Sequence, residues 1–123
     1  MIDVNLTEAE HELCQLVWDF EPIKSGDLVK LCEDRFDWKK STTYTMLKRV
    51  EEKGILKNKD GLVVGMLSQE AYLEEKGKEF VDENFGGSLP KFLTAFSKTK
   101  KLTRKEVDEI QKLINAYKED NND

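Results

Sequence analysis

The feature that most constrains the fold is one turn signal, Asp60-Gly61, which lies between two short runs of β-prone residues. Asp-Gly between such runs predicts a tight β-hairpin. Upstream of it, apolar residues recur at helical intervals, and Gly54 stands where a helix is expected to end in a left-handed cap. The helices expected there span about 8–20, 26–36 with Ser25 as its N-cap, and 40–53. Three helices followed by a small hairpin predict a mainly helical, winged helix-turn-helix fold.

The third expected helix has two different faces. Helical spacing predicts an inward stripe formed by Thr43, Met46, Leu47 and Val50. The other side chains are mostly hydroxyls and cations, which can hydrogen-bond both phosphate oxygens and base edges in a major groove. With two lysines of the hairpin, the candidate DNA-contacting residues are Lys40, Ser41, Thr42, Tyr44, Thr45, Lys48, Arg49, Lys57 and Lys59. From this helix alone, a solvated face with a Ser- and Thr-rich N-terminus stays an open alternative.

Charge is distributed unevenly along this chain, whose net charge is -5. Residues 1–38 carry a net charge of -7, whereas residues 39–59, which include the third helix, carry +5. Charges more than about 8–10 Å apart are largely screened at physiological salt, so a local cationic block can attract phosphate on an acidic protein. The overall acidity also leaves open a winged-helix module that binds protein and not DNA.

The sequence gives little support to catalysis or membrane insertion. It has no phosphate-cradling glycine loop, no metal-ligand cluster and a single histidine, His11, so we expect neither an enzyme nor a bound cofactor. Cys14 and Cys32 fall on stripes expected to be buried, where free cysteine behaves as a small apolar residue. No run has the length and apolarity of a membrane helix and no secretory signal opens the chain, so we expect a cytoplasmic protein.

A boundary between two domains is expected at residue 68, with 1–67 before it and 68–123 after it. The second part predicts three short amphipathic helices: Ser68 caps the first, and Thr103 with Glu106 forms a capping box at the last. Small helical pieces rarely stabilise alone, so packing against a second copy is favoured over folding back on 1–67 in a monomer. A twofold dimer also suits a palindromic DNA site.

Five segments, in order over residues 6–118, are LTEAEHELCQLVW, DWKKSTTYTMLKRVEEKG, AYLEEKGKEF, FGGSLPKFLTAF and LTRKEVDEIQKLI. Together they resemble the BlaI/MecI/CopY (penicillinase repressor) family of bacterial transcriptional repressors. The resemblance implies a winged-helix homodimer that binds palindromic promoter operators and blocks transcription. By position it assigns Ser41, Thr42, Tyr44, Thr45 and Arg49 to the recognition helix, and Lys57 and Lys59 to the wing. The dimerisation segment that it implies comprises Phe80, Phe85, Leu89, Phe92, Leu93, Phe96, Leu102, Ile110, Leu113 and Ile114.

Some positions depart from that family. His11 stands where relatives often carry Trp, and Tyr44 stands where the penicillinase and methicillin repressors carry Arg, so their operator sequence is not transferable. No cysteine follows Cys32 and the chain ends in EDNND, which argues against the copper-responsive branch with its paired Cys-x-Cys motifs. The β-lactam branch is inactivated by proteolysis at an Asn-Phe bond that aligns with Ala95-Phe96 here. Because the Asn is lost, cleavage, and with it a membrane sensor-protease as partner, stays an open question.

Overall fold

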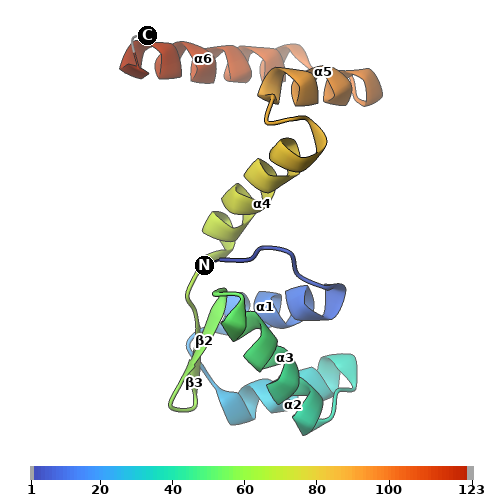
Figure 1. The fold of residues 1–123 in the computed structure, drawn as a ribbon, viewed down its shortest axis with the longest axis vertical. Coiled ribbons are helices and arrows are strands. Elements are labelled where there is room, and N and C mark those ends of the chain that lie inside the picture. Colours follow the sequence, from blue (N-terminus) through green and yellow to red (C-terminus); the bar gives the residue numbers. More distant parts are fainter. Residues whose placement is uncertain (1, 122–123) are drawn as a thin grey trace. The chain divides into compact units, whose positions relative to one another are not determined.

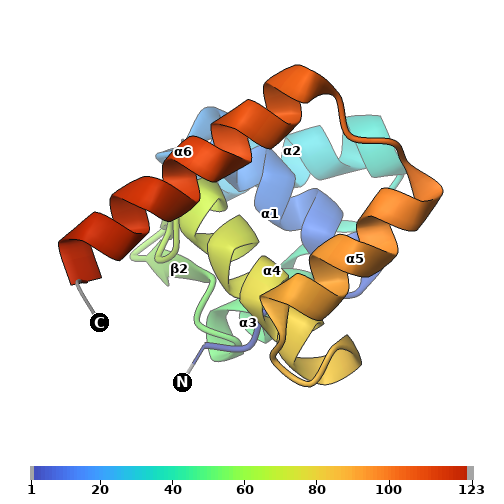
Figure 2. The same cartoon turned by 90° about the horizontal axis from the view of Figure 1, so that it is seen from above.

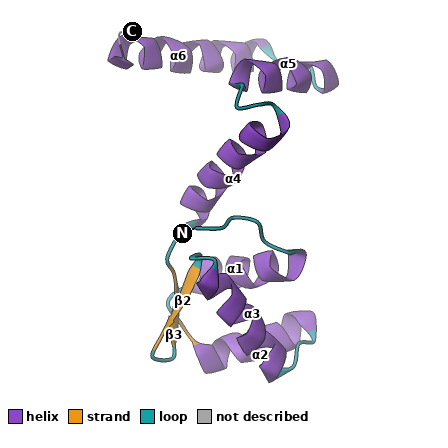
Figure 3. Ribbon diagram, in the orientation of Figure 1, coloured by secondary structure: helices purple, strands orange, loops and turns teal. Residues whose placement is uncertain are grey.

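The computed structural model describes residues 2–121; Met1 and residues 122–123, which end the EDNND tail, lie outside the described residues. In chain order the elements are α1 (Glu8–Phe20), β1 (Ile23–Lys24), α2 (Ser25–Phe36), α3 (Lys40–Glu52), β2 (Leu56–Lys59), β3 (Leu62–Gly65), α4 (Gln69–Asn84), α5 (Leu89–Thr99) and α6 (Arg104–Asn121). Figures 1 and 3 show the predominance of helix. Strand β1 precedes α2, and β2 and β3 follow α3. The predicted class, mainly helical with a small hairpin wing, is confirmed. None of the described helices has the length and apolar composition that crossing a bilayer demands.

Helix α1 begins with the capping box that the sequence predicts. The Thr7 hydroxyl accepts a hydrogen bond from the Glu10 amide at 3.2 Å, and the Glu10 carboxylate accepts one from the Thr7 amide at 2.8 Å. These bonds satisfy N–H groups that a first helical turn otherwise leaves unpaired. The same geometry holds Glu10 toward the interior, where the residue is only 2% exposed.

The start of α2 differs from the prediction. Ser25 is the first helical residue and not the N-cap; Lys24 occupies the cap position and makes no side-chain capping bond. The cause is the short strand β1, which pairs antiparallel with β3 and fixes the backbone that enters α2. The sheet is therefore three-stranded, in the order β1-β3-β2. The Ser25 amide then donates a hydrogen bond to the carbonyl oxygen of Gly61 at 2.8 Å.

The hairpin turns at the predicted place. Lys59 pairs with Leu62, and the two residues between them, Asp60 and Gly61, have φ angles of 54° and 87°. Two positive φ angles define a type I′ turn, whose twist matches that of the flanking strands and which favours Asp and Gly. The side chain of Asn58 also fixes the turn, because its Oδ1 accepts a hydrogen bond from the Gly61 amide at 2.9 Å.

One hydrophobic core lies among α1, α2, α3 and the sheet. Helix α3 packs against both α1 and α2, and α1 also packs against β3 (Figure 1). The predicted inward stripe of α3 is confirmed: Thr43, Leu47 and Val50 are buried, and Met46 packs half-buried against them. The side chains with the least exposure in this core are Leu13, Cys14, Val17, Leu28, Cys32, Leu47, Val50, Ile55, Leu56 and Val63.

The beginning of α4 is tied to α1. The Ser68 hydroxyl caps α4 as predicted, by accepting a hydrogen bond from the Ala71 amide at 3.0 Å. The Trp18 indole Nε1 donates to the carbonyl oxygen of Leu67 at 3.0 Å, and its ring lies 5.2 Å from the Tyr72 ring, centroid to centroid. Tyr72 is 5% exposed and is a member of the core.

The chain forms two compact units, which divide within α4 between Phe80 and Val81. The domain boundary expected at residue 68 stays a prediction. His11, which stands where relatives often carry Trp, packs on the same aromatic cluster, 5.8 Å from Tyr72 and 6.3 Å from Trp18 between ring centroids. The first turns of α4 therefore complete the N-terminal unit.

The C-terminal unit consists of the end of α4 followed by α5 and α6, joined by short connections (Figure 2). Gly86 and Gly87 follow α4 with φ angles of 58° and 77°, where the sequence predicts the helix to end. Thr103 and Glu106 form the predicted capping box at the start of α6. No described residue of this unit is buried.

Candidate nucleic-acid interface

Helix α3 presents its polar residues to solvent. Thr43 and Leu47 on the inner face are each 1% exposed, whereas Tyr44 between them in sequence is 37% exposed. The first turn of α3 contains no carboxylate. The outer face is therefore cationic and rich in hydroxyls, and the structure brings the predicted residues of this helix together. Its exposed members are Lys40, Ser41, Tyr44, Thr45, Lys48 and Arg49, and Thr42 is half-buried beside them.

Ser25 connects this face to two other elements. The Tyr44 hydroxyl donates a hydrogen bond to the Ser25 hydroxyl oxygen at 3.2 Å, which joins α3 to the first residue of α2. The Ser25 amide in turn donates to the carbonyl oxygen of Gly61, in the turn of the hairpin. Sequence reasoning misses Ser25 as a site residue, because both partners lie far along the chain and no local pattern brings them together.

The sheet carries a second cationic surface. Strand pairing sets Lys24 and Lys59 on either side of Leu62, and directly paired residues point to the same side of a sheet. Lys57, two residues before Lys59, points to that side as well. All three lysines are exposed, and Leu62 among them is 42% exposed. We call Lys24, Lys57, Lys59 and Leu62 the lysine face. The sequence does not indicate Lys24 as a contact residue, because its two-residue strand leaves no periodic signal.

Lys53 belongs to the cationic block 39–59 but serves the fold. Its Nζ lies 2.8 Å from Oε1 of Glu10 and 2.6 Å from the carbonyl oxygen of Asn5. The side chain of Glu10 is 3% exposed and that of Lys53 is 23% exposed. Burial acts to raise the pKa of Glu10, but hydrogen bonds from Lys53 and Thr7 outweigh it and hold the pKa below its usual value. This positive charge is therefore matched inside the protein.

The two cysteines are structural. Cys14 and Cys32 are both 0% exposed and free of disulfides. Burial, with the nearby Glu10 carboxylate, raises the pKa of Cys14 to about 12. Burial also raises the pKa of Cys32, although the Thr43 hydroxyl opposes the rise. Protonated thiols are poor nucleophiles and poor metal ligands. In residues 2–121 no three His, Cys, Asp or Glu side chains are grouped to hold a metal ion.

The segment predicted for dimerisation exposes much of its apolar surface. Leu89, Leu113 and Ile114 are 62%, 70% and 51% exposed. Phe85 and Phe92 pack edge to face with their ring centroids 5.5 Å apart. The other exposed members are Phe80, which precedes the division between the units, and Phe96; the half-buried members are Phe85, Phe92, Leu93, Leu102 and Ile110.

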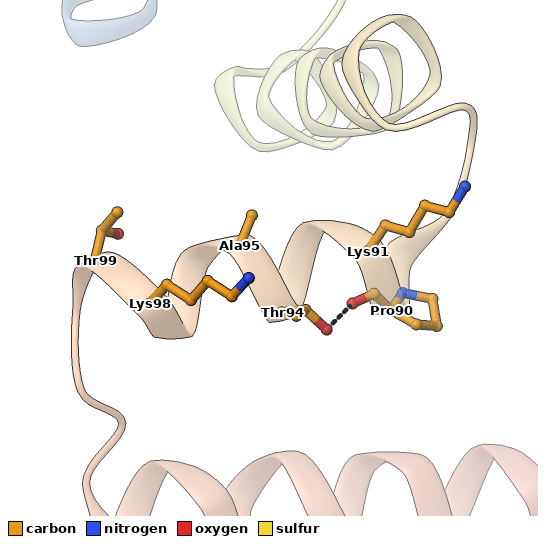
Figure 4. A pocket seen from close by; sticks show the side chains of 6 residues that line it. All are labelled: Pro90, Lys91, Thr94, Ala95, Lys98 and Thr99. Atoms are coloured by element: carbon orange, nitrogen blue, oxygen red, sulfur yellow. Dashed lines mark hydrogen bonds between the residues drawn. The ribbon is translucent and has the colours of Figure 1, made fainter.

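The bond Ala95-Phe96 lies in the helical backbone of α5. Ala95 is half-buried and Phe96 is 37% exposed. Figure 4 shows Ala95 among the side chains that line an open depression, all of which come from this one helix. In the same view Thr94 Oγ1 donates a hydrogen bond to the carbonyl oxygen of Pro90 at 2.8 Å. The bond is close to the surface, but α5 has to unwind locally before a protease can cut it.

Comparison with known proteins gives one consistent result. Residues 6–116 match the profile of a protein family described as penicillinase repressor. The chain is 25% identical over 117 residues to the penicillinase repressor of Bacillus licheniformis, covering 92% of this chain and 91% of that protein. It is 21% identical over 114 residues to the methicillin resistance regulatory protein MecI of Staphylococcus aureus, covering 89% of this chain and 93% of MecI. A shorter match, 36% identical over 52 residues, joins it to an uncharacterized protein of Latilactobacillus sakei.

Proposed function

The chain belongs to the penicillinase repressor family, and on that premise we propose that it is a homodimeric repressor that binds a palindromic promoter operator through α3. The family consists of transcriptional repressors and not of enzymes. We place its activity in the cytoplasm, where a bacterial repressor meets promoter DNA.

The outer face of α3 is the observation that carries the proposal. Its exposed side chains supply cations for phosphate oxygens and hydroxyl groups for both phosphates and base edges. Arg49 and Lys48 are the cations furthest from the N-terminus of the helix, and Tyr44 and Thr45 stand one turn before them. A helix with this composition on its free face is suited to the major groove, where each base pair presents a distinct pattern of donors and acceptors.

The lysine face supports affinity more than sequence choice. Three exposed ammonium groups on one side of a small sheet can neutralise phosphates and release their counterions, a contribution that does not depend on base sequence. In this proposal the sheet lies along the DNA backbone while α3 enters the groove. Lys24 joins Lys57 and Lys59 in that role.

A second copy of the chain is the proposed cover for the apolar surface of α5 and α6. The C-terminal unit has no buried residue of its own among those described, so it lacks a core that could stabilise it alone. Leu113 and Ile114 on α6 and Leu89 on α5 are more than half exposed. A twofold interface between two copies buries the same patch on both and also presents two α3 helices to the two halves of a palindrome.

The test is fluorescence anisotropy with labelled DNA from upstream of the protein's own gene, against a scrambled duplex of equal composition. Each duplex is titrated at about 50 mM and about 200 mM salt, a range over which phosphate contacts weaken steeply. Tighter binding to the native duplex, with a steep salt dependence, supports a sequence-reading repressor. Equal weak binding to both duplexes contradicts sequence reading and leaves only electrostatic attraction.

The alternative is a winged-helix module that binds protein, and the same titration separates the two. Absence of binding to either duplex at about 50 mM salt overturns the repressor proposal, because phosphate contacts are strongest there. Association with a protein partner that is insensitive to salt then favours the alternative.

Ala95-Phe96 is the candidate bond if induction proceeds by proteolysis through a membrane sensor-protease. Two features argue against cleavage at this bond: it lies in a helix, and its first residue, Ala95, departs from the family pattern. Isolating the repressor from cells before and after induction, and measuring its mass, tests the idea. Two fragments that meet between Ala95 and Phe96 support it, and an intact chain in induced cells contradicts it.

A further inference from the structure

We propose that Ser25 is a positioning residue that presents the Tyr44 phenol to DNA as a hydrogen-bond acceptor. The consequence is a preference, at one position in each operator half-site, for a base whose major-groove edge carries an amino group, adenine or cytosine. This inference rests on the proposed function, and it assigns a part of the operator's sequence preference to a named pair of side chains.

The geometry around Ser25 is fixed from two sides. Ser25 is the first residue of α2, and its amide is held by the Gly61 carbonyl oxygen at 2.8 Å. Its hydroxyl oxygen lies 3.2 Å from the Tyr44 hydroxyl oxygen. Tyr44 is 37% exposed, so its ring reaches solvent from the outer face of α3 while its hydroxyl is anchored. The hydrogen bond favours the orientation of the phenol in which its proton points to Ser25.

The direction of the hydrogen bond follows from the chemistry of the two hydroxyl groups. A phenol is a stronger acid than an aliphatic alcohol and a weaker acceptor, so the Tyr44 hydroxyl donates and the Ser25 oxygen accepts. A phenol has one proton to donate. Once that proton is directed at Ser25, the lone pairs of the Tyr44 oxygen are what remains for DNA.

An acceptor discriminates among bases in the major groove. Adenine presents an amino group at N6 and cytosine one at N4, whereas guanine O6 and N7 and thymine O4 are acceptors. An acceptor on the protein therefore bonds to adenine or cytosine and is left facing an acceptor at guanine or thymine. Without Ser25 the phenol proton turns freely and can meet either kind of edge, so the preference disappears while the ring stays in place.

The experiment measures base preference and not affinity alone. The duplex bound selectively by the wild-type protein is changed to each of the four bases at every position of one half-site, and the dissociation constants are compared. Wild-type protein is expected to favour adenine or cytosine at one position by about fivefold, the value of one neutral hydrogen bond. Tyr44→Phe identifies that position, because its preference there is lost.

Three further variants separate positioning from a merely structural role. Ser25→Ala is expected to lose the preference at the same position, and Ser25→Thr, which restores a hydroxyl, is expected to regain it. The double variant Ser25→Ala with Tyr44→Phe should show the same base preferences as Tyr44→Phe alone, since the two side chains act as one unit. Gly26→Ala is the matched control: a methyl group there meets no atom within 4 Å, and the preference is expected to persist.

The outcomes that overturn the inference differ from failure of the proposed function. Selective binding in which Ser25→Ala keeps the wild-type preference at every position overturns the role of Ser25 and leaves the repressor proposal intact. A preference for guanine or thymine at the position identified by Tyr44→Phe likewise overturns only the inference. If the wild-type protein does not distinguish its native duplex from a scrambled one, both proposals fall.

Discussion

Nζ of Lys53, at the C-terminal cap of α3, lies 2.8 Å from Oε1 of Glu10, a carboxylate buried in the first turn of α1. The pair joins the end of the proposed recognition helix to the start of the chain's first helix. Glu10 also accepts the hydrogen bond from the Thr7 amide, so one carboxylate completes a helix cap and a tertiary contact at once. An ion pair remote from the outer face of α3 therefore adds to the core packing that holds this helix against α1.

Glu10→Gln is expected to lower the free energy of unfolding at neutral pH by about 2 kcal/mol, because it breaks a largely buried ion pair. Gln can still accept the Thr7 amide bond, so the capping box is kept. The pKa of Glu10 is lowered in the folded protein, so its stabilisation is present above the ordinary carboxyl value of 4.5 and is lost as the pH falls through the lowered value.

Urea unfolding of wild type and Glu10→Gln at a series of pH values checks this dependence. The difference between the two proteins should be largest above about pH 5 and shrink in more acidic solution. Glu106→Gln, in the exposed capping box of α6, is the matched control and should change stability little. If the difference in unfolding free energy between the two proteins is independent of pH, the stabilisation does not come from the ionised carboxylate of Glu10.

Arg49→Ala is expected to weaken binding to the selected operator by about tenfold or more, because a cation on the outer face of α3 is removed. Sedimentation of the variant should still give the wild-type oligomer. Arg35→Ala is the control, since that guanidinium lies 5.4 Å from the centre of the Phe20 ring and is not one of the residues proposed to contact DNA. Unchanged operator affinity for Arg49→Ala counts against the docking of α3.

Lys24→Ala, Lys57→Ala and Lys59→Ala should each reduce the slope of log affinity against log salt by about one, since each removes one phosphate contact. Lys53→Ala should leave that slope unchanged although it destabilises the fold, because its charge is matched by Glu10. Lys118→Ala, on α6, controls for loss of a positive charge elsewhere. A slope that falls equally for Lys53→Ala and Lys57→Ala contradicts the separation of the two roles.

Thr43→Val is expected to raise the free energy of unfolding by about 1 kcal/mol, because it removes a buried hydroxyl that is poorly hydrogen-bonded. Oγ1 of Thr43 is buried and has no hydrogen-bond partner in good geometry. The Cys32 thiol beside it is a weak hydrogen-bond partner. Thermal unfolding measures the gain. Thr45→Val, at an exposed position of the same helix, should give no such gain, and a destabilised Thr43→Val would show that the hydroxyl is satisfied after all.

Leu113→Asp is expected to convert the proposed dimer to monomer in sedimentation experiments at micromolar concentration. Leu113 is 70% exposed on α6, and a carboxylate there would be desolvated in an apolar interface. Operator binding should weaken with it, because two linked recognition helices are replaced by one. Gln111→Asp places the same charge on an exposed polar position nearby and should leave the dimer intact. A dimer that survives both substitutions excludes this face as the dimer interface.

Features determined by neighbouring residues could be predicted from the sequence. The capping boxes at Thr7 and Thr103, the turn at Asp60-Gly61 and the inward stripe that includes Leu47 each follow from residues a few positions apart. The polar outer face of α3 follows from the same periodicity. These local signals give the fold class and most of the candidate contact residues.

Features that depend on distant pairing could not be predicted in the same way. Strand β1 has two residues, and it exists only because it pairs with β3. That pairing places Lys24 on the lysine face and makes Ser25 the first residue of α2 instead of its cap. The burial of Tyr72 against Trp18 likewise depends on two residues far apart in the sequence.

The indole of Trp18, bonded to the Leu67 carbonyl and flanked by Tyr72, also gives the protein an intrinsic optical probe. Its emission reports whether the first turn of α4 is docked on α1. The second tryptophan, Trp38, lies 5.0 Å from the Phe36 ring in the connection between α2 and α3, so its emission reports on a different end of the same unit. Replacing either one by Phe leaves a single tryptophan, so that the emission of each end can be followed separately as DNA is added, without any attached dye.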